Sequence, residues 1–147
     1  MSARNGRSAV MTIGALARRT GVPVKMLREY EDAGLIYTVG RSAGNYRLFD
    51  EEALWCVGVI GTLRALGLTL NEIRQLTSSY LGRPEEPIGP HLAILLRAAR
   101  TRTDAQIAEL QRRRQRIEQF ETDHAGQLAG SAPDFRADDP HFQPARA

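Results

Sequence analysis

The chain has 147 residues, of which 42% are hydrophobic and 25% charged, and its formal net charge is +3 at pH 7. This length fits one small domain with an appendage, and the single cysteine, Cys56, excludes an internal disulfide and a thiolate cage. No apolar run approaches the roughly 18 residues that span a bilayer and no secretory signal is evident, so we expect a cytoplasmic protein without membrane contact.

The positive charge is concentrated near the N-terminus. Residues 1–50 carry eight Lys and Arg side chains against four Asp and Glu. A basic segment of this kind suits a polyanionic partner such as nucleic acid, although a net charge of +3 is ordinary for a soluble protein.

Two short helices are predicted after a flexible arm over residues 1–11. Residues 12–21 place apolar side chains at helical spacing, with Thr12 as the N-cap and Gly21 as the stop. A second helix, over residues 23–34, begins with a proline and ends at a glycine. Two short helices joined by a tight turn are typical of a helix-turn-helix motif.

A hairpin and two further helices are predicted next. Residues 35–49 are β-rich at both ends and contain glycines in the middle, which predicts a hairpin. Asp50 is placed to cap a helix that runs to Leu66, and this helix is apolar nearly all round, so we expect it to be central. The string "TLNE", residues 69–72, is a capping box that opens a short helix.

The rest of the chain predicts a linker, a long helix and a tail. Three prolines in residues 82–90 indicate a linker. Residues 91–123 contain no proline or glycine and carry an apolar stripe too narrow to be buried in a monomer, so we expect a coiled-coil dimerisation helix. Residues 124–147 are expected to be disordered. The expected dimerisation residues are Leu92, Leu96, Ala99, Ile107, Leu110, Ile117 and Phe120.

The second predicted helix has a face of mixed charge. At 100° per residue, Lys25, Arg28, Glu29 and Asp32 fall together, and Met26 falls on the opposite apolar face. The charged residues form two i,i+4 pairs, so a solvated face with weak ion pairs explains the pattern. A recognition helix in the major groove of DNA explains it as well.

The string "GRSAGNYRLFD", residues 40–50, supports the DNA-binding alternative. In it Arg41 and Arg47 can donate charge-assisted hydrogen bonds to phosphates, and Asn45 and Tyr46 can donate further ones. An ordinary polar turn with Tyr46 folded into the core is the other interpretation. A helix-turn-helix followed by a basic hairpin is a winged helix.

Three segments in chain order, "TIGALARRTGVPVKMLREYEDAGLI", "NYRLFDEEAL" and "LRALGLTLNEI", resemble the N-terminal DNA-binding domain of the MerR family of bacterial transcription regulators. The resemblance covers residues 12 to about 80. It implies a mainly α fold, with a winged helix-turn-helix domain over residues 12–81, a short β-hairpin wing and a long helix in an antiparallel coiled coil. It also implies a homodimer on a pseudo-palindromic promoter, which bends and untwists the DNA spacer for RNA polymerase.

The resemblance carries residue roles as well. Thr12 and the first helical turn would meet a phosphate. The family's common string "TLRYYE" reads "MLREYE" here, so Glu29 replaces a tyrosine and is expected to orient Lys25 or to accept a hydrogen bond from a cytosine amine. Together with the hairpin, the expected DNA-binding residues are Thr12, Arg18, Arg19, Lys25, Arg28, Arg41, Asn45, Tyr46 and Arg47.

The sequence offers little evidence for redox, metal or catalytic chemistry. Cys56 lies in an apolar helix, which favours a buried structural thiol, and a redox or electrophile sensor is the alternative. The three histidines lack metal-ligand spacing, so we expect no metal and no cofactor. No catalytic constellation is present, so we do not expect an enzyme.

Two other functions stay open from the sequence. One is an excisionase-like architectural DNA-binding protein, against which the long helix argues. The other is a coiled-coil adaptor in which the mixed-charge helix is merely solvated. A small-molecule effector also stays open, and the dimer junction near Trp55 and Tyr80 is its expected place.

Overall fold

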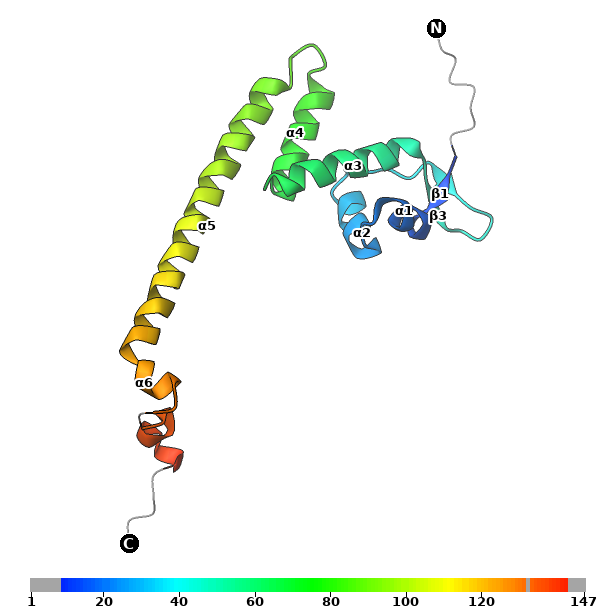
Figure 1. Cartoon of the computed structure of the whole chain (residues 1–147). Helices are drawn as coiled ribbons and strands as arrows, with labels where there is room; N and C mark the ends of the chain where they lie inside the picture. The colour runs from blue at the N-terminus through cyan, green and yellow to red at the C-terminus, as the bar shows by residue number, and fades with distance from the viewer. Residues whose placement is uncertain (1–8, 132, 143–147) are drawn as a thin grey trace. The chain divides into compact units, whose positions relative to one another are not determined.

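The computed structural model describes residues 9–131 and 133–142, and it is mainly helical with one small sheet (Figure 1). The chain divides into two compact units, and the boundary between Thr101 and Arg102 falls inside the longest helix. The fold class, a winged helix-turn-helix followed by a long helix, is the one that the sequence predicts.

The first unit holds the winged helix-turn-helix. The sheet is built from three short strands, and the helices surround one hydrophobic core. The elements are β1 (Met11–Thr12), α1 (Ile13–Thr20), α2 (Val24–Asp32), β2 (Gly40–Arg41), β3 (Arg47–Phe49), α3 (Glu51–Ala65), α4 (Leu70–Gly82) and the first part of α5 (Gly89–Asp123).

Side-chain caps start the helices where the sequence predicts. The Thr12 hydroxyl accepts from the amide of Ala15 at 3.2 Å, and Asp50 caps α3 in the same way. At α4, Thr69 and Glu72 bond reciprocally, with the Thr69 amide 2.8 Å from Glu72 Oε1. These bonds satisfy amides that a helix leaves without an internal partner, so the three predicted starts are confirmed.

Gly21 ends α1 with a left-handed backbone, at φ 74°. No atom lies within 4 Å of a Cβ placed there, so a substitution would meet only backbone strain. Gly21→Ala is therefore expected to lower the free energy of unfolding by about 1 kcal/mol. Gly58→Ala, inside α3 and equally uncrowded, is expected to raise it by about 0.5–1 kcal/mol. Urea unfolding followed by circular dichroism measures both, and equal effects would contradict the assignment.

The sheet has the order β1-β3-β2, with both pairs antiparallel. Strand β1 is not predicted by the sequence: Met11 pairs with Phe49 and is 7% exposed, so it belongs to the sheet and not to the predicted arm. Residues 1–8 of that arm lie outside the described residues. The hairpin is also shorter than predicted, because Leu35 and Ile36 are buried but precede β2.

Helix α3 packs against α1, β3 and α4 on one side only. Ala53, Val57 and Ile60 are buried on that side, whereas the Trp55 side chain is 66% exposed. The prediction of a central helix is therefore wrong in part. Apolar residues on every face mean that a helix could be buried all round. Only the faces against which other elements pack are in fact buried.

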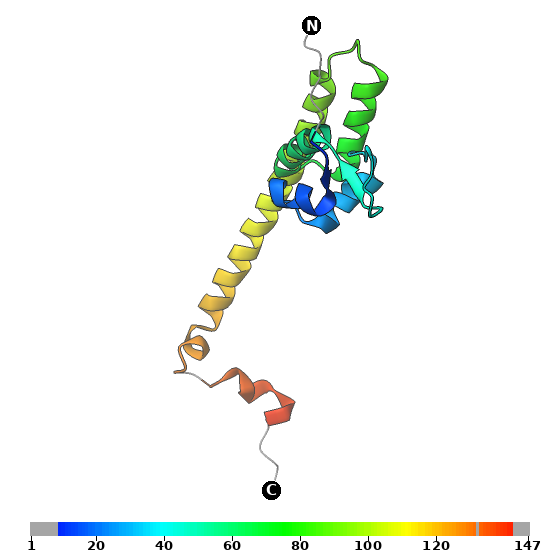
Figure 2. The same cartoon turned by 90° about the vertical axis from the view of Figure 1, so that its right-hand side faces the viewer.

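The start of α5 belongs to the first unit. Helices α4 and α5 run in opposite directions and are joined by residues 83–88 (Figure 2), and Ile88 packs on the core. The predicted linker is thus a short anchored loop. Ala99 and the unpredicted Leu95 are buried in the core cluster, with Leu92 and Leu96 packed against it. Of the first three predicted dimerisation residues, Ala99 is therefore buried within its own chain, and Leu92 and Leu96 are partly buried there.

The second unit contains the remainder of α5, α6 (Ala125–Leu128) and two 3-10 turns, Phe135–Asp138 and Pro140–Phe142. Ordered turns over residues 124–131 and 133–142 differ from the disordered tail that the sequence predicts, and residue 132 and residues 143–147 lie outside the described part. Phe120 stacks on Phe135 with ring centroids 6.0 Å apart, and the His124 ring lies beside both.

The remaining side chains of the predicted dimer stripe are about half exposed. Ile107, Leu110 and Ile117 are 48%, 57% and 52% exposed. The arginines between them partly pair with acids on the same helix: Arg112 Nη2 lies 2.7 Å from Glu109 Oε2. In the described ranges, none of the helices combines the length and the apolar content needed to cross a bilayer.

Candidate nucleic-acid interface

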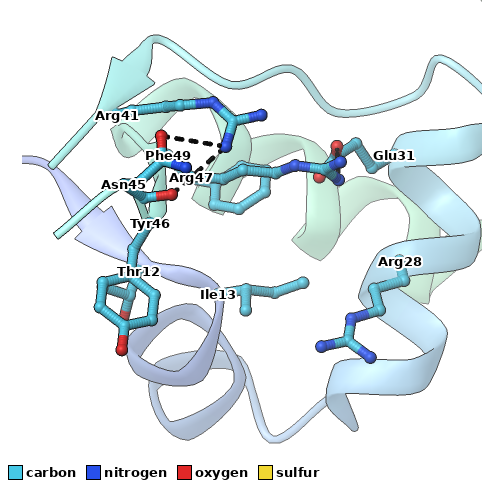
Figure 3. Close-up of a pocket in the computed structure, with 9 residues that line it drawn as sticks. All are labelled: Thr12, Ile13, Arg28, Glu31, Arg41, Asn45, Tyr46, Arg47 and Phe49. Atoms are coloured by element: carbon cyan, nitrogen blue, oxygen red, sulfur yellow. Dashed lines mark hydrogen bonds and ion pairs between the residues drawn. The ribbon is translucent and has the colours of Figure 1, made fainter.

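A cavity of about 480 Å³ lies between α2 and the wing hairpin, residues 40–49 (Figure 3). Its lining holds three arginines and one carboxylate, and six of the nine predicted DNA-binding residues are among the side chains that form it. The lining residues are Thr12, Ile13, Arg28, Glu31, Arg41, Asn45, Tyr46, Arg47 and Phe49.

Helix α2 is fixed by one buried edge. Leu27 and Tyr30 are 0% and 3% exposed, and this orientation turns Arg28 outward and leaves Glu31 half-buried. In Figure 3 the Arg28 guanidinium reaches into the open side of the cavity. Within the described ranges Arg28 forms no ion pair, so its charge is available to an anionic partner.

The predicted mixed-charge face is only partly as expected. Lys25, Glu29 and Asp32 are exposed, but neither i,i+4 pair on this face is formed among the residues that the structure describes. Met26, predicted on the apolar side, is 38% exposed. The interpretation as a face laced with ion pairs loses its support, because the cations on α2 are unpaired.

The tip of the wing is held by its own hydrogen bonds. Asn45 adopts a left-handed backbone at φ 67°, a conformation that asparagine tolerates. The Ser42 amide donates to the Tyr46 carbonyl at 2.8 Å, and Arg41 Nη1 lies 3.3 Å from the Asn45 carbonyl. Tyr46 is 67% exposed, so the interpretation that folds it into the core is wrong. An ordered tip of this kind can meet a partner with little loss of conformational freedom.

Arg47 has a partner that the sequence analysis missed. Its Nη1 donates to Oε1 of Glu31 at 2.6 Å, and the two side chains are 53% and 18% exposed. Period-two alternation in β3 places Arg47 on the same side as the buried Phe49, which is the side that faces the helices. The spacing of two residues between Arg47 and Phe49 is therefore the feature of the sequence that could have indicated a partner for Arg47 on the helices. The phosphate contact of Arg47 stays a prediction, and the guanidinium that would make it already donates one hydrogen bond to Glu31.

The Glu31–Arg47 pair contributes little to stability. An ion pair with a half-exposed partner stabilises a fold by at most about 1 kcal/mol. The second carboxylate oxygen, Oε2, is buried and has no hydrogen-bond partner among the described residues. Such an atom costs about 1–3 kcal/mol, so the two effects leave no net gain.

The remaining predicted DNA-binding residues lie beside the cavity. Thr12 contributes to the lining and caps α1, so its hydroxyl already accepts one hydrogen bond. Arg18 and Arg19 on α1 and Lys25 on α2 are exposed but are not part of the lining. The cavity thus unites α2 with the wing, and the cations of α1 stand outside it.

Cys56 is only half-buried, and burial raises the pKa of its thiol, with Glu52 and Asp50 raising it further. A raised pKa leaves less thiolate near neutral pH, which opposes a sensor role. We expect iodoacetamide to alkylate Cys56 more slowly than it alkylates glutathione at pH 7.5, as followed by mass spectrometry. If iodoacetamide alkylated Cys56 faster than it alkylated glutathione, the sensor interpretation would be restored.

Metal ligands do not cluster in the part of the chain that the structure describes. No group of three or more His, Cys, Asp or Glu side chains is placed there to hold an ion. The His124 ring lies beside Phe120, with ring centroids 4.3 Å apart and planes tilted by 50°, and its Nδ1 lies 2.8 Å from Gln127 Oε1.

Two family models match the chain. The model described as MerR HTH family regulatory protein matches residues 11–80, and the one described as MerR, DNA binding matches residues 56–120. The chain is also similar to the transcription regulator PbrR691 from Ralstonia metallidurans, solved in complex with lead(II): identity is 33%, the TM-score is 0.62, and 76% of this chain and 86% of that chain are covered. The chain belongs to the MerR family of transcription regulators.

Other MerR relatives agree with this assignment. Nodulation protein NolA of a Bradyrhizobium species is 37% identical over 111 residues, which cover 76% of this chain and 43% of NolA. The chain thus spans less than half the length of that relative. A MerR family regulator from Bacillus cereus has a TM-score of 0.60 at 20% identity, with 92% of this chain and 95% of that chain covered, which shows the same fold. MerR proteins are regulators and not enzymes.

Proposed function

We propose that the chain binds double-stranded promoter DNA, with α2 in the major groove and the wing hairpin along the sugar-phosphate backbone. The observation that carries this proposal is Arg28: it projects, unpaired within the described ranges, into a cavity bounded by an ordered basic wing. Phosphates of the DNA backbone are bound by cationic side chains such as these arginines. An exposed helix beside them can enter the major groove and contact the edges of the bases.

We further propose that the chain acts as a homodimer on a pseudo-palindromic site. The support is the exposed stripe of Ile107, Leu110 and Ile117, which has the narrow width of a coiled-coil seam. Two copies joined antiparallel would hold two wings at a fixed separation. Bending and untwisting of the promoter spacer would then realign its elements for RNA polymerase in the cytoplasm.

An effector would act at the junction between the copies. Trp55 and Tyr80 are 66% and 60% exposed, and exposed aromatic rings suit an apolar organic molecule. The chain has one cysteine, so we do not propose a thiolate metal site of its own.

Duplex binding as a function of salt tests the DNA-binding proposal. We expect the fluorescence anisotropy of a labelled duplex from the chain's own upstream DNA to report binding that weakens linearly in log–log form between about 50 and 200 mM salt. A scrambled duplex should bind more weakly, and footprinting should show two protected half-sites. Failure to bind any duplex at low salt would refute the proposal.

A further inference from the structure

We infer that Glu31 is a positioning residue of the DNA interface, which holds Arg47, and through it the wing hairpin, at a fixed place beside α2. The inference rests on the proposed DNA-binding function. It assigns a role to an acid that lies in a surface otherwise shaped for an anion.

The Glu31–Arg47 bond is a direct tie between two separate elements. The pair joins residues 16 apart in sequence, and its Nη1–Oε1 distance is 2.6 Å. Across residues 9–131 no other hydrogen bond or ion pair joins α2 to the wing hairpin. Figure 3 shows the Arg47 side chain crossing the space between wing and helix to reach Glu31. Without this bond, the position of the wing relative to α2 would depend on the core contacts of β3 and on the pairing of β3 with β1.

Fixing Arg47 also fixes the tip of the wing. Arg41 is the register partner of Arg47 across the β2–β3 ladder, and Arg41 Nη1 in turn bonds the Asn45 carbonyl. A chain of contacts therefore runs from Glu31 through Arg47 and Arg41 to the turn. Each step is a hydrogen bond or a strand pairing. The bond at Glu31 therefore restricts the position of the wing tip as well as that of Arg47.

A carboxylate at this place is explained by geometry and not by charge or stability. Its negative charge repels the phosphates that the cavity would receive. Its buried Oε2 has no partner in the described part of the chain, which opposes folding. The group that gains from Glu31 is Arg47, whose planar guanidinium is oriented by one bond while the side chain stays 53% exposed. Its other nitrogens remain free to donate to a phosphate.

The sign of one substitution tests the inference. Glu31→Gln removes a negative charge beside the DNA, so charge alone would tighten binding. We expect about tenfold weaker binding instead, because a neutral amide holds Arg47 less firmly. Glu85→Gln is the control: Glu85 is an exposed acid in the loop between α4 and α5, outside α2 and the wing hairpin, so removal of its charge should leave affinity unchanged or slightly higher. Anisotropy titrations at one salt concentration compare the variants, with thermal melts to show that each is folded.

A double-mutant cycle shows whether Glu31 acts through Arg47. In the Arg47→Gln background, Glu31→Gln should cause no further loss of affinity. An additional tenfold loss there would overturn the inference, and so would a Glu31→Gln variant that binds as tightly as Glu85→Gln. If Glu31→Gln melts below the assay temperature, Glu31→Asp replaces it: this variant keeps the charge, shortens the reach and should also weaken binding. If the unaltered chain binds no duplex, the proposed function itself fails.

Discussion

Replacing Leu110 and Ile117 together by glutamate is expected to convert the chain into a monomer and to weaken binding to a two-half-site duplex by at least about a hundredfold. Both side chains are more than half exposed on α5. Paired copies would bury them, and two carboxylates in that seam would meet a low-dielectric contact without partners. A monomer loses the effective concentration that links two weak half-site contacts.

The matched control is Gln111→Glu with Gln115→Glu, which adds the same charge to exposed positions on other faces of the helix. This variant should remain a dimer in sedimentation and bind DNA with only a modest loss from added repulsion. Circular dichroism checks that both variants keep α5 helical. A Leu110/Ile117 variant that still sediments as a dimer would show that another surface joins the copies.

Replacing Arg28 by alanine is expected to lower DNA affinity by about a hundredfold in the dimer. Arg28 lines the cavity and forms no ion pair among the described residues, and a good arginine contact is worth about 1–3 kcal/mol. The loss occurs once in each half-site, so about tenfold per copy becomes about a hundredfold for the pair. If Arg28 binds phosphate, the slope of log affinity against log salt should also fall by about two, one for each copy.

Arg74→Ala is the control for Arg28. Arg74 is an exposed arginine on α4 that does not line the cavity, so the same charge change should alter affinity and salt slope only slightly. A loss spread evenly over sequence variants of the duplex indicates a phosphate contact, and a loss confined to one base pair indicates a base contact. Equal effects of the two substitutions would remove Arg28 from the interface.

Much of the first unit follows from signals within a few residues of chain. The caps at Thr12, Asp50 and Thr69 and the left-handed stop at Gly21 are bonds or backbone angles that involve near neighbours, so the sequence predicts them directly. The order of helix, turn, helix and basic hairpin, with the residues in it, also indicates the MerR family. Strand β1 was missed because two residues carry no periodicity of their own.

Charge pairing at the interface could not be predicted in this way. The sequence offers Lys25 and Arg28 acids at i,i+4, and neither pair forms in the described ranges, whereas Arg47 finds Glu31 at a separation of 16 residues. The choice depends on which elements the core brings together. Phe49 and Tyr30 are buried side chains of β3 and α2, and that packing sets the distance at which Arg47 meets Glu31.

By itself, then, the sequence determined where α1, α3 and α4 begin, where α1 ends, the winged helix-turn-helix order and the family, because each depends on local bonds and local periodicity. Tertiary structure alone decided that the start of α5 is buried at Leu95 and Ala99 and that Trp55 faces outward. It also decided that Arg47 is held by Glu31, while Arg28 has no ion-pair partner among the described residues. These outcomes depend on which faces pack together. That packing involves segments far apart in the chain, so it cannot be predicted from local sequence.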